Sequence, residues 1–410
     1  MMMDKSVVDA DTLLREDRWL LPEGIEELLP PRARRLEALR RSLLDCYASW
    51  GYELVIPPQI EFLDSLLVGT GSDLDLQTFK LTDQITGRLM GLRADMTPQV
   101  ARIDAHSLRR EGPVRLCYMG TVVHTRPAGF VGSRTPLQIG AELYGHAGIE
   151  SDLEIICLMV RTLEVAGVGP LHLDLGHVGI FRSLARSAGL DAVAESDLFD
   201  ALQRKAVPEI ERLLAVVPAE RPARAGLLAL AQLNGGADIL AQAQQLLQGC
   251  GDEVLAALSS LQRLSALVAA RLPQVTLHLD LAELRGYRYH TGIVFAAFVP
   301  GRGQSVAQGG RYDGIGRVFG KDRPATGFSS DLKSLLLFAE EGDDSMGGVF
   351  APDDDDGELW RQIEQLRGSG ERVVVALPGQ QGGAREAGCD RRLVKGDSGW
   401  SVVELMEQGR

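Results

Sequence analysis

With 410 residues, of which 45% are hydrophobic, the chain is long enough for a sizeable core and for two or three structural units. Its formal net charge of −13 disfavours phosphate backbones, so we expect no DNA partner and do not expect tRNA binding as its main task. Residues 1–18 lack the apolar segment of a secretory signal, and no apolar run approaches the roughly 20 residues that span a membrane. The five scattered cysteines form no CxxC pair, which predicts neither a zinc site nor a disulfide framework and favours a cytoplasmic location.

The first sixty residues predict an arm, a helix and a short strand. Residues 1–21 are expected to form a loose N-terminal arm. Leucine and aromatic residues recur at helical spacing from Ala33 to Trp50, which predicts an amphipathic helix that ends at Gly51. A strand is expected at 52–56, where two prolines stop it.

Short alternating patterns continue along the chain. They predict a hairpin from 78–81 and 88–93, strands at 114–123, 137–144 and 171–175, and a helix at 152–164 with Asp152 near its cap. Thr97 and Pro98 predict another helix, with Thr97 as the N-cap and Pro98 at the first helical position.

The second half of the chain divides by composition. Residues 181–272 are rich in Ala and Leu and predict a helical insertion within a core of residues 22–338, whose strand-rich pattern resumes at 275–281. Residues 339–357 contain four consecutive aspartates and are expected to form an acidic linker. Residues 358–410 predict a small α/β tail, with a helix at 359–367 and strands at 372–377, 392–394 and 401–405.

Two neighbouring motifs are the most informative feature of the sequence. Arg285-Gly-Tyr-Arg-Tyr-His-Thr-Gly292 opens a segment that predicts a strand as far as Phe295, and Gly309-Gly-Arg-Tyr-Asp-Gly314 follows it. They resemble the RGLDYYTG and GGRYDGL signatures of histidyl-tRNA synthetase, a class II aminoacyl-tRNA synthetase. Segments across about residues 20–338 resemble that family in the same order, and the helix at 33–50 with its strand resembles the motif that forms the family's dimer interface.

The resemblance implies a fold and a site. The fold class is α+β: a mixed, mainly antiparallel sheet with flanking helices, a helical insertion and a small α/β tail. The site is a histidine pocket, in which carboxylates or amides bind the ammonium group, a cation binds the carboxylate and polar groups bind both imidazole nitrogens. Transferred residue by residue, the pocket comprises Asp95, Thr97, Gln138, Glu142, Arg285, Tyr289, His290, Arg311 and Tyr312.

Each of these residues also has an ordinary structural interpretation. Asp95 and Thr97 are suited to capping a helix, and Gln138 with Glu142 would lie on one face of a strand as a polar pair. Arg285 would be equally normal in a surface salt bridge. Their joint occurrence in the family's order favours the pocket over these separate interpretations.

The groups that bind ATP in the family are missing from the matching positions. Adenylation needs fixed cations beside the phosphates. One family arginine falls on His124, and histidine is largely neutral at pH 7. The other falls on Ser334, preceded by Lys333, while Asp331 occupies a glycine position. We therefore expect no catalytic residues, and neither a cofactor nor a metal.

The short tail and the lost arginines resemble one branch of the family, the regulatory subunits of ATP phosphoribosyltransferase. Leu92-Arg-Ala-Asp-Met-Thr-Pro-Gln99 and residues 126–145 are similar to that branch, although His124 departs from it. The resemblance implies a homodimeric core within a hetero-oligomer. Its partner would be the short-form catalytic subunit, and its effector would be L-histidine. Two alternatives stay open: a truncated histidyl-tRNA synthetase, and a stand-alone sensor of histidine or tRNA.

Overall fold

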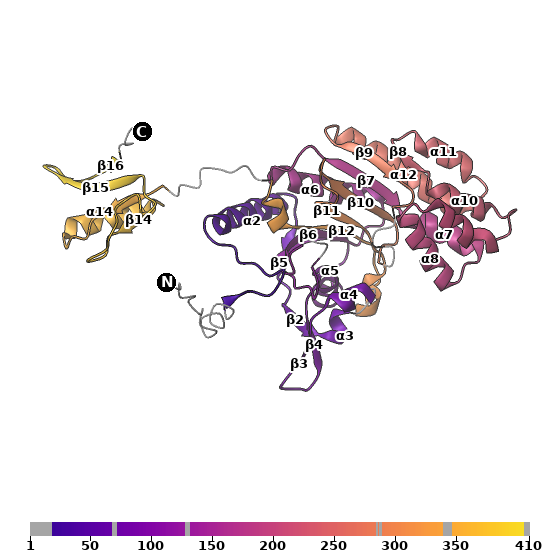
Figure 1. The fold of residues 1–410 in the computed structure, drawn as a ribbon, viewed down its shortest axis with the longest axis horizontal. Helices are drawn as coiled ribbons and strands as arrows, with labels where there is room; N and C mark the ends of the chain where they lie inside the picture. Colours follow the sequence, from indigo (N-terminus) through magenta and orange to yellow (C-terminus); the bar gives the residue numbers. More distant parts are fainter. Residues whose placement is uncertain are drawn as a thin grey trace, which may run out of the picture. The chain divides into compact units, whose positions relative to one another are not determined.

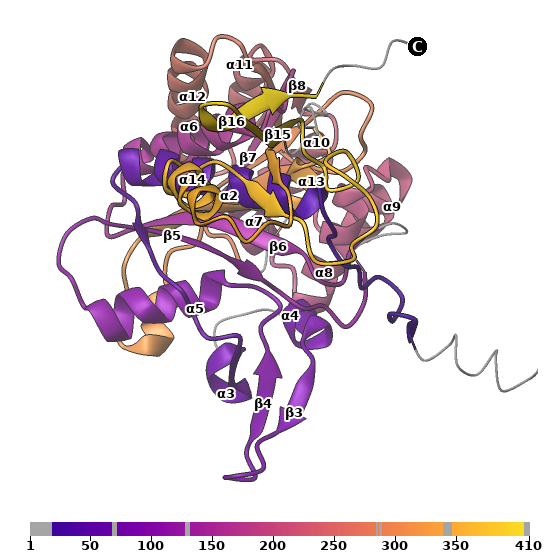
Figure 2. The ribbon, with the colours of Figure 1, turned by 90° about the vertical axis from the view of Figure 1, so that its left-hand side faces the viewer.

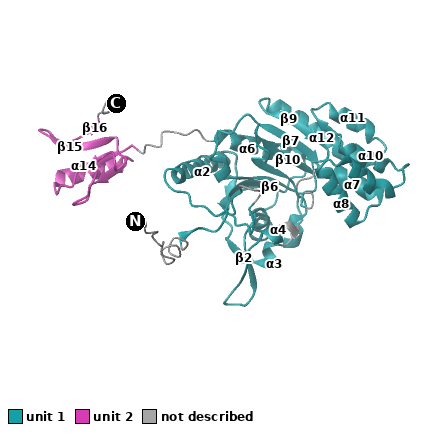
Figure 3. Ribbon diagram, viewed as in Figure 1, with its two compact units in different colours: residues 1–339 teal, residues 340–410 magenta. Residues whose placement is uncertain are grey.

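A computed structural model describes residues 19–67, 72–127, 132–283, 286, 289–338 and 347–405 of the protein. The chain forms two compact units, Met1–Ala339 and Glu340–Arg410 (Figure 3). Each unit has its own hydrophobic core, and the two are described separately below.

A nine-stranded mixed sheet organises the first unit (Figure 1). Its strands lie in the order β1 (Glu53–Leu54), β5 (Val114–Thr121), β6 (Leu137–Tyr144), β12 (Ala325–Asp331), β11 (Ala307–Arg311), β10 (Ile293–Phe298), β7 (His172–His177), β9 (Thr276–Asp280) and β8 (Asn234–Gly235). The β1–β5 and β7–β9 pairs are parallel and the other pairs are antiparallel. The predicted α+β fold with a mainly antiparallel mixed sheet is therefore confirmed.

Helices surround this sheet. In the described part of unit 1 they are α2 (Arg32–Ser49), α3 (Leu63–Leu66), α4 (Ser72–Gln77), α5 (Thr97–Arg102), the π-helix Ile103–Leu108, α6 (Ile149–Val165), α7 (Val178–Ala188), α8 (Ala192–Gln203), α9 (Val207–Leu213), the 3-10 helix Leu214–Val216, α10 (Pro222–Leu230), α11 (Ile239–Leu246), α12 (Asp252–Arg271), the 3-10 helix Ile315–Phe319 and α13 (Leu332–Leu335). Helices α7 to α12 gather at the end of the sheet that carries β7, β9 and β8 (Figure 1).

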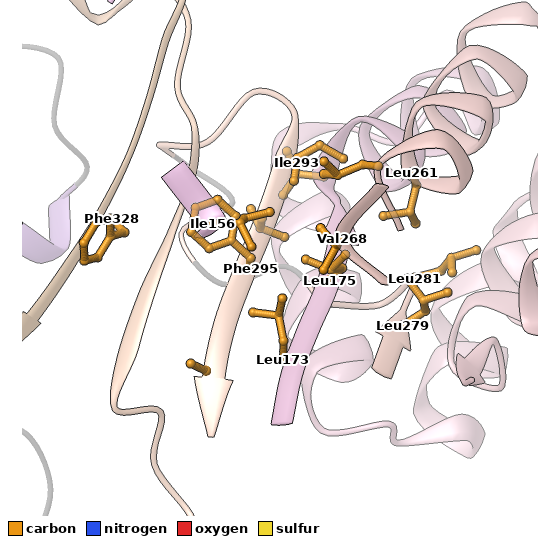
Figure 4. Close-up of a cluster of buried hydrophobic side chains, with 14 of the residues drawn as sticks. Ile156, Leu173, Leu175, Leu261, Val268, Leu279, Leu281, Ile293, Phe295 and Phe328 are labelled. Carbon is orange, nitrogen blue, oxygen red and sulfur yellow. The ribbon is translucent and has the colours of Figure 1, made fainter. Parts of the chain in front are cut away.

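The core of unit 1 forms where the sheet meets the helices. Leu173 and Leu175 of β7 and Phe295 of β10 belong to one buried cluster with Leu261 and Val268 of α12 (Figure 4). Burial of one such side chain stabilises the fold by roughly 1.5–3 kcal/mol. The sheet that carries the candidate site is thus held rigidly on one side by these helices.

Helix α12 is long and apolar enough to cross a membrane by length and composition alone, which the sequence analysis did not anticipate. One such helix is weak evidence of a span. In the structure α12 packs against α6, α7 and β7, and residues such as Val254, Leu258 and Leu264 are buried there. This is the packing of a core helix.

A three-stranded sheet extends from the body of unit 1 in both views (Figure 1, Figure 2). Its strands are β2 (Ile60–Phe62), β4 (Leu89–Leu92) and β3 (Lys80–Thr82), and β3 pairs with β4 as the predicted hairpin. Strand β4 ends three residues before Asp95, so this small sheet leads directly into the candidate site.

The second unit is one helix on a four-stranded sheet. The strands lie in the order β14 (Val373–Val375), β13 (Val349–Ala351), β15 (Arg391–Gly396) and β16 (Gly399–Glu404), and α14 (Gly357–Gly368) buries Leu359 and Ile363 in the core of this unit. Strand β13 lies inside the range 339–357 that was expected to be only a linker. That expectation was wrong because the prediction relied on the four aspartates at 353–356 and overlooked the short apolar run at 349–351.

Several other boundaries differ from the predictions. The strand expected to begin at 285 begins at Ile293, because Tyr289 and His290 both donate backbone hydrogen bonds to Gly286 in a tight turn. The strand predicted at 52–56 comprises only Glu53–Leu54. Residues 181–272, expected to lack strands, contain β8.

Candidate functional site

A cavity lies on one face of the nine-stranded sheet, above a row of residues that the strand register brings together. The row runs Glu142, Gly327, Gly310, Val294, Gly176 across β6, β12, β11, β10 and β7. Three of these positions are glycines, and Glu142, Gly327 and Val294 of this row line the cavity. Glycine is required at two of them, because a Cβ atom at Gly327 would overlap the Glu142 carboxylate and one at Gly310 would lie 2.7 Å from Cδ2 of His290.

The cavity has a volume of about 140 Å³. One bound water occupies roughly 10–15 Å³ on the same measure, so the space suits a small organic molecule. The side chains and backbone that line it belong to Asp95, Thr97, Glu142, Glu283, Gly286, Tyr289, His290, Val294, Phe295, Ala296, Gln308, Gly309, Tyr312, Gly327, Phe328 and Ser329.

Glu142 is a buried carboxylate surrounded by hydroxyl groups. One of its oxygens accepts hydrogen bonds from the hydroxyls of Tyr118 at 3.0 Å and Thr97 at 3.1 Å, and the other accepts one from Tyr312. Burial raises the pKa of Glu142 to about 8, although these hydrogen bonds act in the opposite direction. Without a ligand the side chain therefore carries a proton at pH 7, and a nitrogen donor from a ligand would favour the charged form.

Asp95 and Gln138 form a second polar group at the same end of the cavity. The Gln138 amide donates to Asp95 at 2.8 Å and accepts from the backbone N–H of Met96 at 2.9 Å. Thr97 is the first residue of α5, and its hydroxyl makes no cap. The predicted N-cap role of Thr97 was therefore wrong, because its hydroxyl points to Glu142 instead.

Aromatic side chains cover the cavity. Tyr289 stacks on Tyr312 with ring centroids 5.0 Å apart and meets His290 edge to face at 5.5 Å. The hydroxyl of Tyr289 is buried and has no hydrogen-bond partner in the described part of the chain. A buried hydroxyl without a partner costs free energy, and a polar ligand in the cavity would remove that cost. Gly286 permits this arrangement, since its φ of +64° and its contact with the His290 ring both exclude a side chain.

Arg311 is not among the residues that line the cavity, and its predicted part in binding histidine stays a prediction. Its guanidinium is buried and donates to Asp152 at 3.0 and 3.1 Å, to Ser151 at 2.8 Å and to the backbone oxygens of His146 and Gly148. Burial raises the pKa of Asp152, and the ion pair with Arg311 opposes that rise. The arginine therefore joins β11 to α6 as a structural group.

The remaining predicted residues divide into three groups. Asp95, Thr97, Glu142, Tyr289, His290 and Tyr312 line the cavity together. Gln138 reaches it only through its hydrogen bond to Asp95. Arg285 lies outside the described residues. The sequence analysis missed Glu283, although an acidic residue two positions before the first motif in an apolar stretch was a visible signal.

A wider groove continues from the cavity and shares Asp95, Gln308 and Ser329 with it. Among the described residues that line the groove, Arg302 is the one lysine or arginine, and its guanidinium lies 4.1 Å from the centre of the Phe338 ring. The described lining of the groove therefore contains no pair of fixed cations for a polyphosphate.

The positions that replace the family's phosphate arginines have other partners. His124 bonds the backbone oxygen of Ala94 at 2.9 Å. Ser334 donates to Asp331 at 2.6 Å, and this carboxylate also accepts from the backbone of Leu137. Lys333 approaches Thr135 at 3.4 Å and does not line the groove, so it does not replace an arginine there. The described residues contain no group of three or more side chains suited to holding a metal.

Comparison with known families gives two matches that together span most of the chain. The family model for histidyl-tRNA synthetase matches residues 24–335. The model for the ATP phosphoribosyltransferase subunit HisZ C-terminal domain matches residues 346–403.

Named relatives and solved structures agree with these matches. An ATP phosphoribosyltransferase regulatory subunit from Thioalkalivibrio sulfidiphilus is 60% identical over 391 residues, which cover 95% of this chain and 99% of that protein. One from Alkalilimnicola ehrlichii is 61% identical over 392 residues, with 95% and 98% covered. A crystal structure of an ATP phosphoribosyltransferase regulatory subunit/histidyl-tRNA synthetase from Bacillus halodurans has a TM-score of 0.80 at 26% identity and covers 91% of this chain and 97% of that one.

A more distant structure shows the same fold within an assembly. A chain of the ATP phosphoribosyl transferase (HisG:HisZ) complex from Thermotoga maritima has a TM-score of 0.55 at 18% identity, with 72% of this chain and 97% of that one covered. At this identity the similarity establishes the fold alone.

Replacing Arg311 by Met should lower the free energy of unfolding by about 3–5 kcal/mol, because it leaves Asp152 charged, buried and unpaired. Denaturant unfolding measures the effect. Arg317→Met is the matched control: its ion pair with Asp322 is exposed, and loss of such a pair costs about 0–1 kcal/mol. Equal losses in the two variants would contradict the structural role of Arg311.

Glu142 should make the stability of the ligand-free protein depend on pH. Its folded-state pKa of about 8 exceeds the ordinary value of 4.5, so between these values the folded chain binds one more proton than the unfolded chain. The free energy of unfolding should therefore fall as pH rises through this window, by at most about 1.4 kcal/mol per unit, and level off above pH 8. Denaturant unfolding of the wild type and of Glu142→Gln from pH 5 to 8 measures this, and parallel curves would rule out a buried, proton-binding Glu142.

Proposed function

This chain belongs to the family of ATP phosphoribosyltransferase regulatory subunits, and we propose that it acts as the non-catalytic subunit that activates the short-form catalytic subunit and responds to L-histidine. The catalytic partner joins ATP to phosphoribosyl pyrophosphate in the first step of histidine biosynthesis. Near full-length identity of about 60% to relatives with that name carries the regulatory assignment. The buried carboxylate in a cavity of amino-acid size supports the choice of effector.

Histidine fits the polar groups of the cavity by type. Asp95, held by Gln138, supplies oxygens for the ammonium group. Glu142 and the hydroxyl of Tyr289, which has no hydrogen-bond partner among the described residues, are available to the imidazole, whose nitrogens need polar partners when buried. Arg285, which the sequence assigns to the histidine carboxylate, lies outside the described residues and remains a prediction.

The proposal excludes aminoacylation as the activity. Transfer of an adenylyl group needs cations beside the phosphates before charge develops on the transferring phosphorus. The groove next to the cavity has Arg302 alone among its described lysines and arginines, and Lys333 is directed to Thr135. The chain would therefore bind the amino acid without activating it.

The partner assignments are part of the same proposal. Relatives about 60% identical to this chain are named regulatory subunits of ATP phosphoribosyltransferase, and a regulatory subunit requires a catalytic partner, which supports such a complex here. We propose that two copies of this chain associate through α2 and the edge strand β1, and that the assembly works in the cytoplasm without DNA or tRNA. Regulation then requires that histidine bind the active and inhibited assemblies with different affinities, since a ligand shifts an equilibrium only by that difference.

Two other functions remain as alternatives to this proposal. A truncated histidyl-tRNA synthetase would need histidine-dependent ATP–pyrophosphate exchange, which the cation-poor groove disfavours. A stand-alone sensor would bind histidine and would neither bind nor activate a catalytic subunit.

The proposal is tested by assaying a short-form ATP phosphoribosyltransferase with and without this chain across a histidine titration. We expect activity to rise on mixing and to fall as histidine increases, while this chain alone has no activity. The two proteins should also elute together from a sizing column. No change in activity with separate elution would favour the stand-alone sensor, and ATP–pyrophosphate exchange by this chain alone would favour the synthetase.

A further inference from the structure

Tyr144 is a buried tyrosine of β6 that the proposed pocket does not include. Its side chain is 1% exposed, and its ring meets the ring of Tyr312 edge to face with centroids 6.4 Å apart. Tyr144 is not among the described residues that line the cavity, whereas Tyr312 and Glu142 are. The hydroxyl of Tyr312 is hydrogen-bonded to the Glu142 carboxyl group and also donates to the Tyr144 hydroxyl at 3.4 Å. Tyr312 therefore links a group outside the cavity to the carboxyl group inside it.

The Tyr312 hydroxyl has a single hydrogen, so it cannot donate to both neighbours at once. In one arrangement it donates to a charged Glu142. In the other arrangement it donates to Tyr144 and accepts a hydrogen bond from a protonated Glu142. Burial favours the second arrangement in the empty cavity, since it raises the pKa of Glu142 to about 8.

The other titratable groups around Glu142 do not replace it as the proton-binding group. The charge of Asp95, just before α5, raises the pKa of Glu142 further. Burial raises the pKa of each neighbouring tyrosine above its ordinary value, so these tyrosines stay neutral at pH 7 to 8. They are Tyr52 after α2, Tyr118 of β5, Tyr144 of β6, Tyr289 before β10 and Tyr312 after β11, and Glu283 and His290 line the same cavity.

A ligand that donates an N–H group changes the balance between the two arrangements. A carboxylate offers about four lone-pair sites to hydrogen-bond donors. The hydroxyls of Thr97, Tyr118 and Tyr312 supply three donors, and a ring N–H of the ligand supplies the fourth. A protonated carboxyl group cannot accept all four, because one of its oxygens carries a hydrogen. Such a ligand therefore favours the charged form of Glu142.

We infer that Glu142, Tyr312 and Tyr144 form a proton switch: histidine binding releases the proton of Glu142 to solvent, and the Tyr312 hydroxyl turns from Tyr144 to Glu142. The O–H bond of the carboxyl group breaks, the proton passes to water, and the carboxylate keeps the electron pair. Tyr144 is the positioning residue, because it takes up the hydrogen of Tyr312 while the cavity is empty. The inference rests on the proposed function, in which the cavity binds histidine, and it makes histidine a stronger effector at higher pH.

Calorimetric titration of the intact chain with L-histidine between pH 7 and pH 8 tests the switch. If binding releases the proton of a group with a pKa of about 8, the affinity should rise about fivefold over this range. Glu142→Gln has no such proton, so its affinity should stay nearly constant, and the ligand's own groups contribute equally in both proteins. An equally flat profile in the intact chain would overturn the inference without the need for any tyrosine variant to fold.

Two matched tyrosine variants test the role of Tyr144 by the direction of their effects. Tyr144→Phe removes the acceptor for the Tyr312 hydrogen and disfavours protonated Glu142, so the rise in affinity should shrink to about twofold for a shift of about one pH unit. Tyr118→Phe removes a donor to the carboxylate, and an opposite shift of that size should enlarge the rise to about ninefold. A general loosening of the core would move both variants in the same direction. That result, or a steeper rise in Tyr144→Phe, would overturn the role of Tyr144.

The ligand-free proteins separate this inference from the proposed function. The pH at which the free energy of unfolding levels off, about 8 in the intact chain, should fall in Tyr144→Phe and rise in Tyr118→Phe. If these shifts appear but the intact chain binds no histidine, the proposed function is wrong, and the ligand-driven release fails with it. If histidine binds but the levelling pH does not shift in these directions, the proton switch alone is wrong.

Discussion

The burial of one carboxylate within the sheet is the constraint on which the site depends. Glu142 lies on β6 beneath the tyrosines, and burial alone would make its charged form very costly. The hydroxyls of Thr97, Tyr118 and Tyr312 offset part of that cost, and Gly327 provides the room for the carboxylate. These groups come from segments far apart in the sequence, so a change at any of them alters the same site.

The two halves of the site differ in the polar groups that line them. The half around Glu142 keeps a dense set of polar groups that suit a small amino acid. The half beyond Gln308 has Arg302 as the one lysine or arginine in its described lining, and the residues in the family's phosphate positions are bonded within the protein.

The sequence predicted the parts of the fold that depend on local patterns. The helix at 33–50 and the strand at 137–144 match α2 and β6 closely, because their apolar spacing reflects the face that each one buries. Local patterns failed where tertiary contacts decide the outcome. Thr97 is a residue type that often caps helices, yet its hydroxyl donates a hydrogen bond to the carboxylate of Glu142 on β6.

The sequence predicted several residues that line the candidate site, but it did not predict how they are arranged in space or which of them contact each other. Motif order identified the residues that converge on the cavity, but it also included Arg311, whose partner Asp152 lies far away in the sequence. Glu283 was missed because it belongs to no motif: it lies in the turn after β9, and its position beside Gly176 of the neighbouring strand β7 brings it to the cavity. Pairing between strands is the information that a single sequence does not contain.

The most direct measurement is the histidine titration of ATP phosphoribosyltransferase activity with the catalytic subunit assembled on the Glu142→Gln variant. If histidine acts through this cavity, the variant should still activate the catalytic subunit, because Glu142 is 1% exposed and cannot contact a partner directly. It should require at least about tenfold more histidine for the same inhibition, since a hydrogen bond to a charged group is lost. Full activation with an unchanged histidine response would contradict the account and assign the effector to another site.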